Sequence, residues 1–188
     1  VEEFDYEVKL ARCTYGKGDD DEQYGVGLAM SYRGVSLGAE GVDFCAAMIN
    51  VQADGSVLVE TGVHENGQGA ESAMVLLAAK ELGIRRERIH YRRSSTSVIP
   101  DSGTTVASRG TIMGGGAVTL AARDLRRRMA GVAALMLQCS PEDIDFREER
   151  LTVEGKGKSV TFDETVTEMF RRQQFPHRGD PPRRRQGS

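Results

Sequence analysis

Two stretches of helical periodicity, each preceded by a glycine-rich segment, constrain the fold of this chain more than any other feature. In residues 70–82 the apolar side chains recur at the spacing of one helical face, and Gly83 supplies a stop signal. Residues 117–137 carry a second stripe of the same kind. The glycines at 114–116 leave the start of this helix open, with Thr105 as its earliest position. The chain is therefore expected to contain two principal helices.

Extended patterns surround these helices. Strands are predicted at residues 24–32, 44–52, 57–61, 88–92, 144–146, 151–153 and 159–162. Asp54-Gly55 predicts a type I′ hairpin turn, and Asp163 is expected to cap a final amphipathic helix at 164–172. The sum predicts an α+β fold, in which a mixed, mostly antiparallel sheet packs with two main helices as a two-layer sandwich.

Composition divides the 188 residues into three parts. Residues 1–23 form an N-terminal segment that ends in an acidic surface loop at 17–23. Residues 24–172 contain the periodic patterns and are expected to form one packed domain. Residues 173–188 are rich in proline and arginine, and we expect this tail to be disordered.

Several classes of protein are disfavoured by the composition. The chain is 39% hydrophobic, and no apolar run approaches the ~20 residues that a membrane span needs. A net charge of -3 gives no general case for binding nucleic acid or membranes, and no signal-peptide pattern opens the sequence. Cys13, Cys45 and Cys139 are too widely spaced for a zinc ribbon or an iron–sulfur cluster. We expect three small buried thiols in a reducing, cytoplasmic setting.

The first glycine-rich segment, at 61–69, reads Thr-Gly-Val-His-Glu-Asn-Gly-Gln-Gly. It ends a predicted strand and opens a helix, so backbone N–H groups and the positive end of the helix dipole are expected to face an anionic or hydrogen-bonding ligand. The amide of Gln68 both donates and accepts, which suits the edge of a heterocycle. The residues alone leave a structural alternative open, a glycine-rich connection in which Gln68 is a satisfied cap.

The second segment, at 100–110, reads Pro-Asp-Ser-Gly-Thr-Thr-Val-Ala-Ser-Arg-Gly. It places hydroxyls, small residues and a turn ahead of the longer helix. Hydroxyls and unpaired N–H groups at a helix start can hold phosphate oxygens. A loop of local hydroxyl turns with a capping threonine is the structural alternative. The presence of two such segments in one domain favours a single phosphate-bearing ligand held between them.

Six short runs occur in one order between residues 24 and 172. They are Gly-Val-Ser-Leu-Gly at 34–38, Asp-Gly-Ser-Val at 54–57, Glu-Asn-Gly-Gln-Gly at 65–69, Ala-Ala-Lys-Glu-Leu-Gly-Ile at 78–84, Thr-Thr-Val-Ala-Ser-Arg-Gly at 104–110 and Gly-Ala-Val at 116–118. In this order and spacing the chain resembles the large subunits of the xanthine dehydrogenase/aldehyde oxidase family of molybdenum hydroxylases.

The resemblance implies that residues 24–172 are a molybdopterin-binding domain, with the cofactor often in a cytosine dinucleotide form. In that family the metal is held by the cofactor and by non-protein ligands, so no metal-ligating residue is expected here and His64 is expected to be an ordinary polar residue. The residues expected to lie beside the pterin or to bind its phosphate tail are Asn66, Gly67, Gln68, Thr105, Val106, Ala107, Ser108 and Gly110.

The same resemblance implies part of an oxidoreductase that oxidises a purine, an N-heterocycle or an aldehyde using water. Iron–sulfur clusters and FAD are expected on other domains or subunits, and the remaining segments of the hydroxylase are the expected partners. The family's general base is a glutamate in a Gly-x-Gly-Glu segment, which this sequence lacks. No catalytic residue is therefore assigned, and the isolated chain is expected to be inactive. An isolated cofactor-binding or assembly domain and a purely structural fragment stay open as alternatives.

Overall fold

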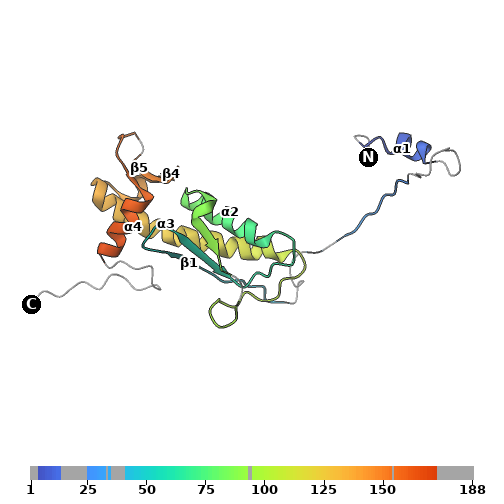
Figure 1. The fold of residues 1–188 in the computed structure, drawn as a ribbon, viewed down its shortest axis with the longest axis horizontal. Coiled ribbons are helices and arrows are strands. Elements are labelled where there is room, and N and C mark those ends of the chain that lie inside the picture. Colours follow the sequence, from blue (N-terminus) through green and yellow to red (C-terminus); the bar gives the residue numbers. More distant parts are fainter. Residues whose placement is uncertain are drawn as a thin grey trace, which may run out of the picture. The chain divides into compact units, whose positions relative to one another are not determined.

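The computed structural model describes residues 4–13, 25–32, 34, 41–92, 95–153 and 155–172. The chain divides into two units, Val1–Arg33 and Gly34–Ser188. In the first unit, helix α1 (Tyr6–Arg12) buries none of its residues. All other helices and strands belong to the second unit (Figure 1). The predicted acidic loop and the predicted disordered tail lie outside the described residues.

The predicted strand at 24–32 is wrong. The described part of this stretch, residues 25–32, has no regular secondary structure. Its alternating large side chains, Leu28, Met30 and Tyr32, are all exposed. A segment with alternating apolar side chains forms a strand only where a neighbouring strand supplies hydrogen bonds and a core covers one face. No described strand pairs with this stretch.

Three strands form the first sheet, in the order β1-β2-β3: β1 (Ala47–Val51), β2 (Val57–Thr61) and β3 (Ile89–Tyr91). Strands β1 and β2 pair antiparallel, while β2 and β3 pair parallel. A parallel connection needs a crossover, and helix α2 (Ala70–Leu82) supplies it. The predicted strands at 44–52 and 88–92 and the predicted helix at 70–82 are thereby confirmed.

The hairpin between β1 and β2 differs from the predicted type I′ turn. The Gly55 N–H donates to the carbonyl oxygen of Gln52, and only Gly55, with φ +80°, lies in the left-handed region. A type I′ turn centred on Asp54-Gly55 requires positive φ at both residues, and Asp54 does not have it. The connection is instead a three-residue loop, in which a turn is followed by a left-handed glycine. An Asp-Gly pair occurs in both kinds of hairpin, so the sequence did not separate them.

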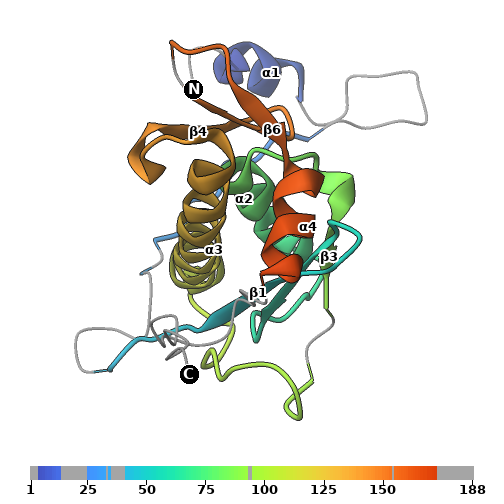
Figure 2. The same ribbon diagram turned by 90° about the vertical axis from the view of Figure 1, so that its left-hand side faces the viewer.

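The long helix α3 (Gly115–Leu137) continues from a π-helical turn, η3 (Gly110–Gly114). The helical path thus starts near Arg109, closer to the early limit than the glycines suggested. Helices α2 and α3 lie side by side on one face of the first sheet (Figure 2). The buried core lies between these helices and the sheet; its fully buried members include Val57, Val59, Met74, Val118 and Met129.

A second sheet follows α3. It contains β4 (Ile144–Arg147), β5 (Arg150–Val153) and β6 (Ser159–Thr161), all antiparallel, and leads into helix α4 (Phe162–Arg171). Short 3₁₀ turns, Arg86–Arg88 and Pro141–Asp143, precede β3 and β4. Helix α4 packs against α3 (Figure 2). The predicted α+β class with mostly antiparallel pairing is confirmed, with the strands divided between two sheets.

Helix α4 is capped by Thr161, and the predicted cap at Asp163 is wrong. The Thr161 hydroxyl accepts from the backbone N–H of Glu164, and the Glu164 carboxylate accepts from the N–H of Thr161. This reciprocal capping box starts the helix two residues earlier than expected. Asp163 lies inside the first turn and pairs with Arg88.

None of the described helices combines the length and the apolar character needed to cross a lipid bilayer. The three cysteines are free, and each is half-buried rather than fully buried. Within the described ranges no three His, Cys, Asp or Glu side chains gather as metal ligands.

Candidate cofactor-binding loops

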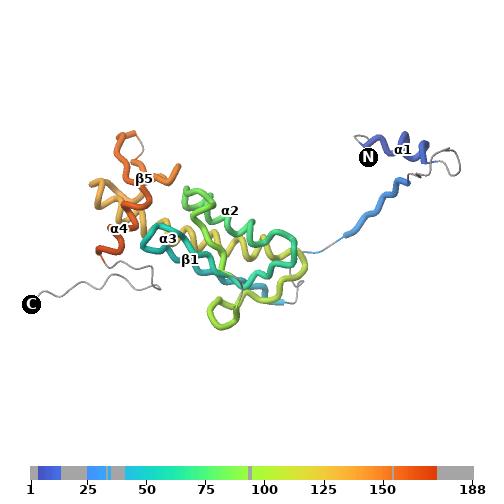
Figure 3. Tube along the Cα trace, in the orientation of Figure 1, coloured from blue at the N-terminus to red at the C-terminus, as the bar shows by residue number. Residues whose placement is uncertain are grey.

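The two glycine-rich segments meet at the start of the helices. We call residues 62–69 the Gln68 loop and residues 100–108 the Ser108 loop. The backbone N–H of Gly62 donates to the Ser102 hydroxyl at 2.8 Å, and that of His64 donates to the Thr105 hydroxyl at 2.8 Å. The trace in Figure 3 brings both loops to the end of the second unit where α2 and α3 begin. The structure thus brings together the segments that the sequence singled out.

Ser102 anchors the Ser108 loop to the sheet. Its side chain is buried, and its hydroxyl donates to the carbonyl oxygen of Ala46 at 2.9 Å while accepting from Gly62. A Cβ on Gly62 would lie 2.9 Å from the Ser102 Cβ, so this approach requires glycine. The Tyr91 hydroxyl donates to the carbonyl oxygen of Val63 at 2.8 Å and fixes the base of the Gln68 loop.

The Glu65 carboxylate occupies the start of helix α2. It accepts backbone N–H groups from Gly67 at 2.7 Å, Gly69 at 3.0 Å and Glu71 at 3.0 Å. These bonds, that from Glu71 first and that from Gly69 next, lower the pKa of Glu65 below its ordinary value. The first turn of α2 was expected to offer its N–H groups to a ligand, but the chain's own carboxylate takes most of them.

Gln68 is folded back on its own loop. Its amide nitrogen donates to the carbonyl oxygen of His64 at 2.8 Å, and its amide oxygen accepts from the N–H of Asn66 at 2.6 Å. An amide group carries two donors and two acceptor positions, so one of each is left over. The side chain is exposed and can present these to a planar polar ligand. The structural alternative, in which the Gln68 amide forms hydrogen bonds within its own loop, is thus partly observed.

The Ser108 loop contains an unusual turn. The N–H of Arg109 donates to the carbonyl oxygen of Val106 at 3.1 Å, and the two residues between them, Ala107 and Ser108, have φ values of +46° and +58°. A non-glycine residue in a sparsely populated backbone region costs on the order of 1–3 kcal/mol, and such residues cluster at binding and switch sites. Two in succession require strong support from their surroundings.

Unpaired backbone donors lie in and just before this turn. In the described part of the chain, the N–H groups of residues 105–108 donate to no protein group. Val106 and Ser108 are exposed, whereas Thr105 and Ala107 are half-buried. Neighbouring free N–H groups and hydroxyls in a strained turn can hold anionic oxygens. This loop, rather than the start of α2, therefore offers the better anion site.

The remaining site predictions are spread around these loops. Asn66 and Gly67 are exposed, and Gly67 has φ +94°, which favours glycine. Gly110 opens the π-helical turn, a feature that often marks functional sites. A Cβ on Gly114 would collide with the Val63 side chain, so the turn packs directly on the Gln68 loop.

Sequence reasoning missed two charged residues of this region. Arg109 is only 3% exposed, although it follows an exposed serine. Nothing in the sequence distinguishes a buried arginine from one in solvent. Glu65 had a usable signal, because an acidic side chain just before a helix often caps its first turn.

Comparisons with known proteins identify the family of this chain. A family model for the molybdopterin cofactor-binding domain matches residues 1–184. Xanthine dehydrogenase of Drosophila pseudoobscura pseudoobscura is 35% identical over 133 residues, which are 71% of this chain and 10% of that protein. The 6-hydroxypseudooxynicotine dehydrogenase complex subunit gamma of Paenarthrobacter nicotinovorans is 31% identical over 142 residues, 76% of this chain and 17% of that protein.

A solved structure is similar as well. The quinoline 2-oxidoreductase of Pseudomonas putida 86 superposes with a TM-score of 0.65 at 28% identity, over 73% of this chain and 17% of that one. The chain belongs to the family of molybdopterin cofactor-binding domains. It spans less than a fifth of the length of each of these relatives.

Proposed function

We propose that this chain is part of the molybdenum-cofactor-binding region of a molybdenum hydroxylase that oxidises a purine, an N-heterocycle or an aldehyde using water. The observation that carries the proposal is the joining of the two loops by the Gly62–Ser102 and His64–Thr105 hydrogen bonds. These bonds join the loop that carries the Gln68 amide to the loop that carries open N–H donors. A ligand with a heterocycle and a phosphate group needs both.

The two loops differ in how well they suit the phosphate group of such a cofactor. The hydroxyls of Thr105 and Ser108, with the N–H groups of Val106 and Ala107, suit phosphate oxygens. The start of α2 does not suit phosphate, because the Glu65 carboxylate already lies there. We therefore assign the phosphate tail to the Ser108 loop.

The pterin is assigned to the Gln68 loop. The free N–H and lone pair of the Gln68 amide would bind a heterocycle edge beside Asn66 and Gly67, whose lack of a side chain admits close approach. Gly110, at the first position of the π-helical turn, borders both loops. When bound, the molybdenum centre supplies the oxidising chemistry, and the role of this chain is to hold and orient the cofactor.

The wider features of the proposal follow from the family. We place the cofactor-binding domain at residues 24–172, with the cofactor as molybdopterin or its cytosine dinucleotide. Iron–sulfur and FAD groups, the general base and the rest of the substrate site would belong to other segments or subunits of a cytoplasmic enzyme.

The test is the molybdenum content of the full-length protein after Gln68→Ala and Ser108→Ala are introduced together. We expect the purified variant to lose most of its molybdenum, measured by mass spectrometry of the metal. Gln52→Ala with Thr167→Ala is the matched control, because both side chains are exposed and neither position lies in or beside the two loops. Normal loading of the Gln68/Ser108 variant would refute the assigned site. A wild-type protein without molybdenum would favour the structural alternative.

A further inference from the structure

The buried side chain of Arg109 joins the segment before strand β1 to the Ser108 loop. We propose that Arg109 and Asp43 are a positioning pair that holds this loop in the conformation that binds phosphate oxygens, an inference that rests on the proposed function. Arg109 would not itself bind the ligand. Its role would be to maintain the left-handed turn immediately before it.

Every donor of the Arg109 guanidinium is engaged. The Nε and one Nη2 N–H reach Asp43 Oδ1 at 2.7 and 2.6 Å, and the other Nη2 N–H donates to the carbonyl oxygen of Phe44. The two Nη1 N–H groups donate to the carbonyl oxygens of Ser102 at 2.9 Å and Thr104 at 2.6 Å. Arginine has five side-chain N–H groups, so none is left for a ligand.

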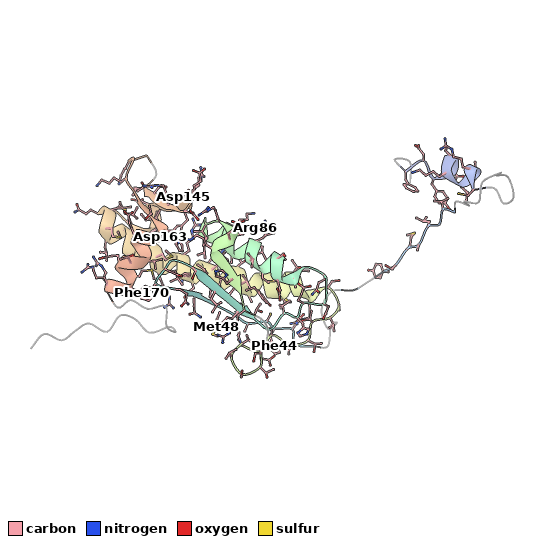
Figure 4. The ribbon with its side chains drawn as sticks, viewed as in Figure 1. Phe44, Met48, Arg86, Asp145, Asp163 and Phe170 are labelled. Atoms are coloured by element: carbon pink, nitrogen blue, oxygen red, sulfur yellow. The ribbon has the colours of Figure 1, made fainter. Side chains whose placement is uncertain are left out.

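These contacts cross-link segments that are far apart in the chain. Asp43 and Phe44 precede strand β1, while Ser102 and Thr104 belong to the Ser108 loop. In Figure 4, Phe44 lies at the end of the second unit where α3 begins, away from Asp145 and Phe170 at its other end. Arg109 and Asp43 are 3% and 12% exposed, so the pair is shielded from solvent.

The fork shape of the guanidinium matters for this role. Its two Nη1 N–H groups bind the carbonyl oxygens of Ser102 and Thr104 in the Ser108 loop, which fixes the direction in which the chain enters the Ala107–Ser108 turn. Both of these residues have positive φ, a conformation that they would leave without such support. Relaxation of either φ would turn the Ser108 hydroxyl and the neighbouring N–H groups away from a common ligand. Lysine keeps the charge but cannot reproduce the fork.

The test compares Arg109→Lys and Asp43→Asn with wild type in the full-length protein. Amide hydrogen exchange reports the loop directly, and molybdenum content reports cofactor loading. In Arg109→Lys we expect exchange at the Gly62 and His64 amides, which donate to the Ser102 and Thr105 hydroxyls, to be roughly tenfold faster or more, with exchange at residues 144–153 unchanged. We also expect inorganic pyrophosphate to slow exchange at 105–108 in cofactor-free wild type and to lose this effect in the variant. Arg123→Ala, a substitution of a more exposed arginine on α3, is the matched control.

The outcomes separate this inference from the proposed function. Wild-type exchange rates at the Gly62 and His64 amides, or wild-type molybdenum content, in Arg109→Lys would overturn the positioning role. If that variant is unfolded throughout, Asp43→Asn, which keeps the shape of the side chain, decides in the same way. A wild-type protein that holds no molybdenum and shows no pyrophosphate effect would refute the proposed function, while the exchange rates would still test the contacts of Arg109.

Discussion

At the scale of single residues, charge placement determines what each loop can bind. Glu65 places a carboxylate at the start of α2, where the helix dipole and three N–H groups stabilise a negative charge. Arg109 places a buried cation against the Ser108 loop, but all of its N–H groups donate to protein oxygens. In the proposed site, an incoming phosphate is therefore excluded from the first position and accepted at the second.

Replacement of Glu65 by Gln tests the first of these placements. The lowered pKa means that the charged carboxylate stabilises the fold fully above the ordinary value of 4.5, and that this contribution is lost as the pH falls through the lowered value. Glu65→Gln is expected to unfold at a lower temperature than wild type at neutral pH. The difference should shrink as the pH is lowered below 4.5. Thermal unfolding measured across this range checks it, and a difference that does not vary with pH would contradict it.

At the scale of elements, the π-helical turn η3 packs on the Gln68 loop at Gly114. A Cβ on Gly114 would overlap the Val63 side chain, which is buried, whereas a Cβ on Gly116 would meet nothing within 4 Å. The two positions are neighbours in one helical path but differ in the space beside them. Packing, rather than helix propensity, therefore explains the first glycine.

Alanine at these two glycines should act in opposite directions. Gly114→Ala is expected to destabilise the protein by about 1–3 kcal/mol through overpacking. Gly116→Ala should stabilise it by roughly 0.5–1 kcal/mol, because alanine restricts the unfolded chain in a helix interior. Chemical denaturation of both variants measures the effect. Equal effects at the two sites would show that the Val63 contact does not explain the choice of glycine.

The capping box of α4 gives a second test at this scale. Thr161→Ala removes the hydroxyl that accepts from the Glu164 N–H and is expected to cost about 1 kcal/mol of unfolding free energy. Thr167→Ala, at an exposed position of the same helix, is the control and should be close to neutral. Urea denaturation of the two variants measures this difference. Equal free energies of unfolding would mean that Thr161 does not cap the helix.

The elements differ in how far the sequence predicted them. Residues 70–82 were placed as a helix because their apolar face, their length and Gly83 all agree. The strand at 24–32 failed because alternation says nothing about whether a partner strand exists. The early start of α4 was missed because Thr161 and Asp163 are both good caps, and only the position of Glu164 separates them. The division of the strands into two sheets depends on long-range packing, which a local pattern does not contain.

The same contrast holds for the candidate site. The loops were located because glycines and hydroxyls mark strand-to-helix connections, and the structure brings both loops together. The sequence could not predict which backbone N–H groups remain without a partner. The side chains of Glu65 and Gln68 accept hydrogen bonds from N–H groups of the first loop. The buried position of Arg109 depends on contacts with Asp43, more than sixty residues away.

At the scale of the whole molecule, this chain corresponds to a small share of its relatives, between 10% and 17% for the three compared. Its two loops form one side of the proposed cofactor site. The described residues hold no metal-ligand cluster, and the sequence has no Gly-x-Gly-Glu segment. In the proposed enzyme, these residues would bind and orient the cofactor.

The chain alone should not turn over substrate. Expressed by itself in a molybdenum-containing medium, it is expected to show no molybdenum-dependent hydroxylation of a purine, an N-heterocycle or an aldehyde, because it lacks the family's general base. An assay with an artificial electron acceptor measures this. Turnover that requires molybdenum would mean that the base lies within these 188 residues.

The most direct measurement is a crystal structure of the full-length protein with its cofactor bound. The account predicts phosphate oxygens within hydrogen-bond distance of the N–H groups of residues 105–108, the pterin edge at the Gln68 amide, and Glu65 still on the start of α2. A cofactor held by other segments, or a phosphate in the place of the Glu65 carboxylate, would contradict it.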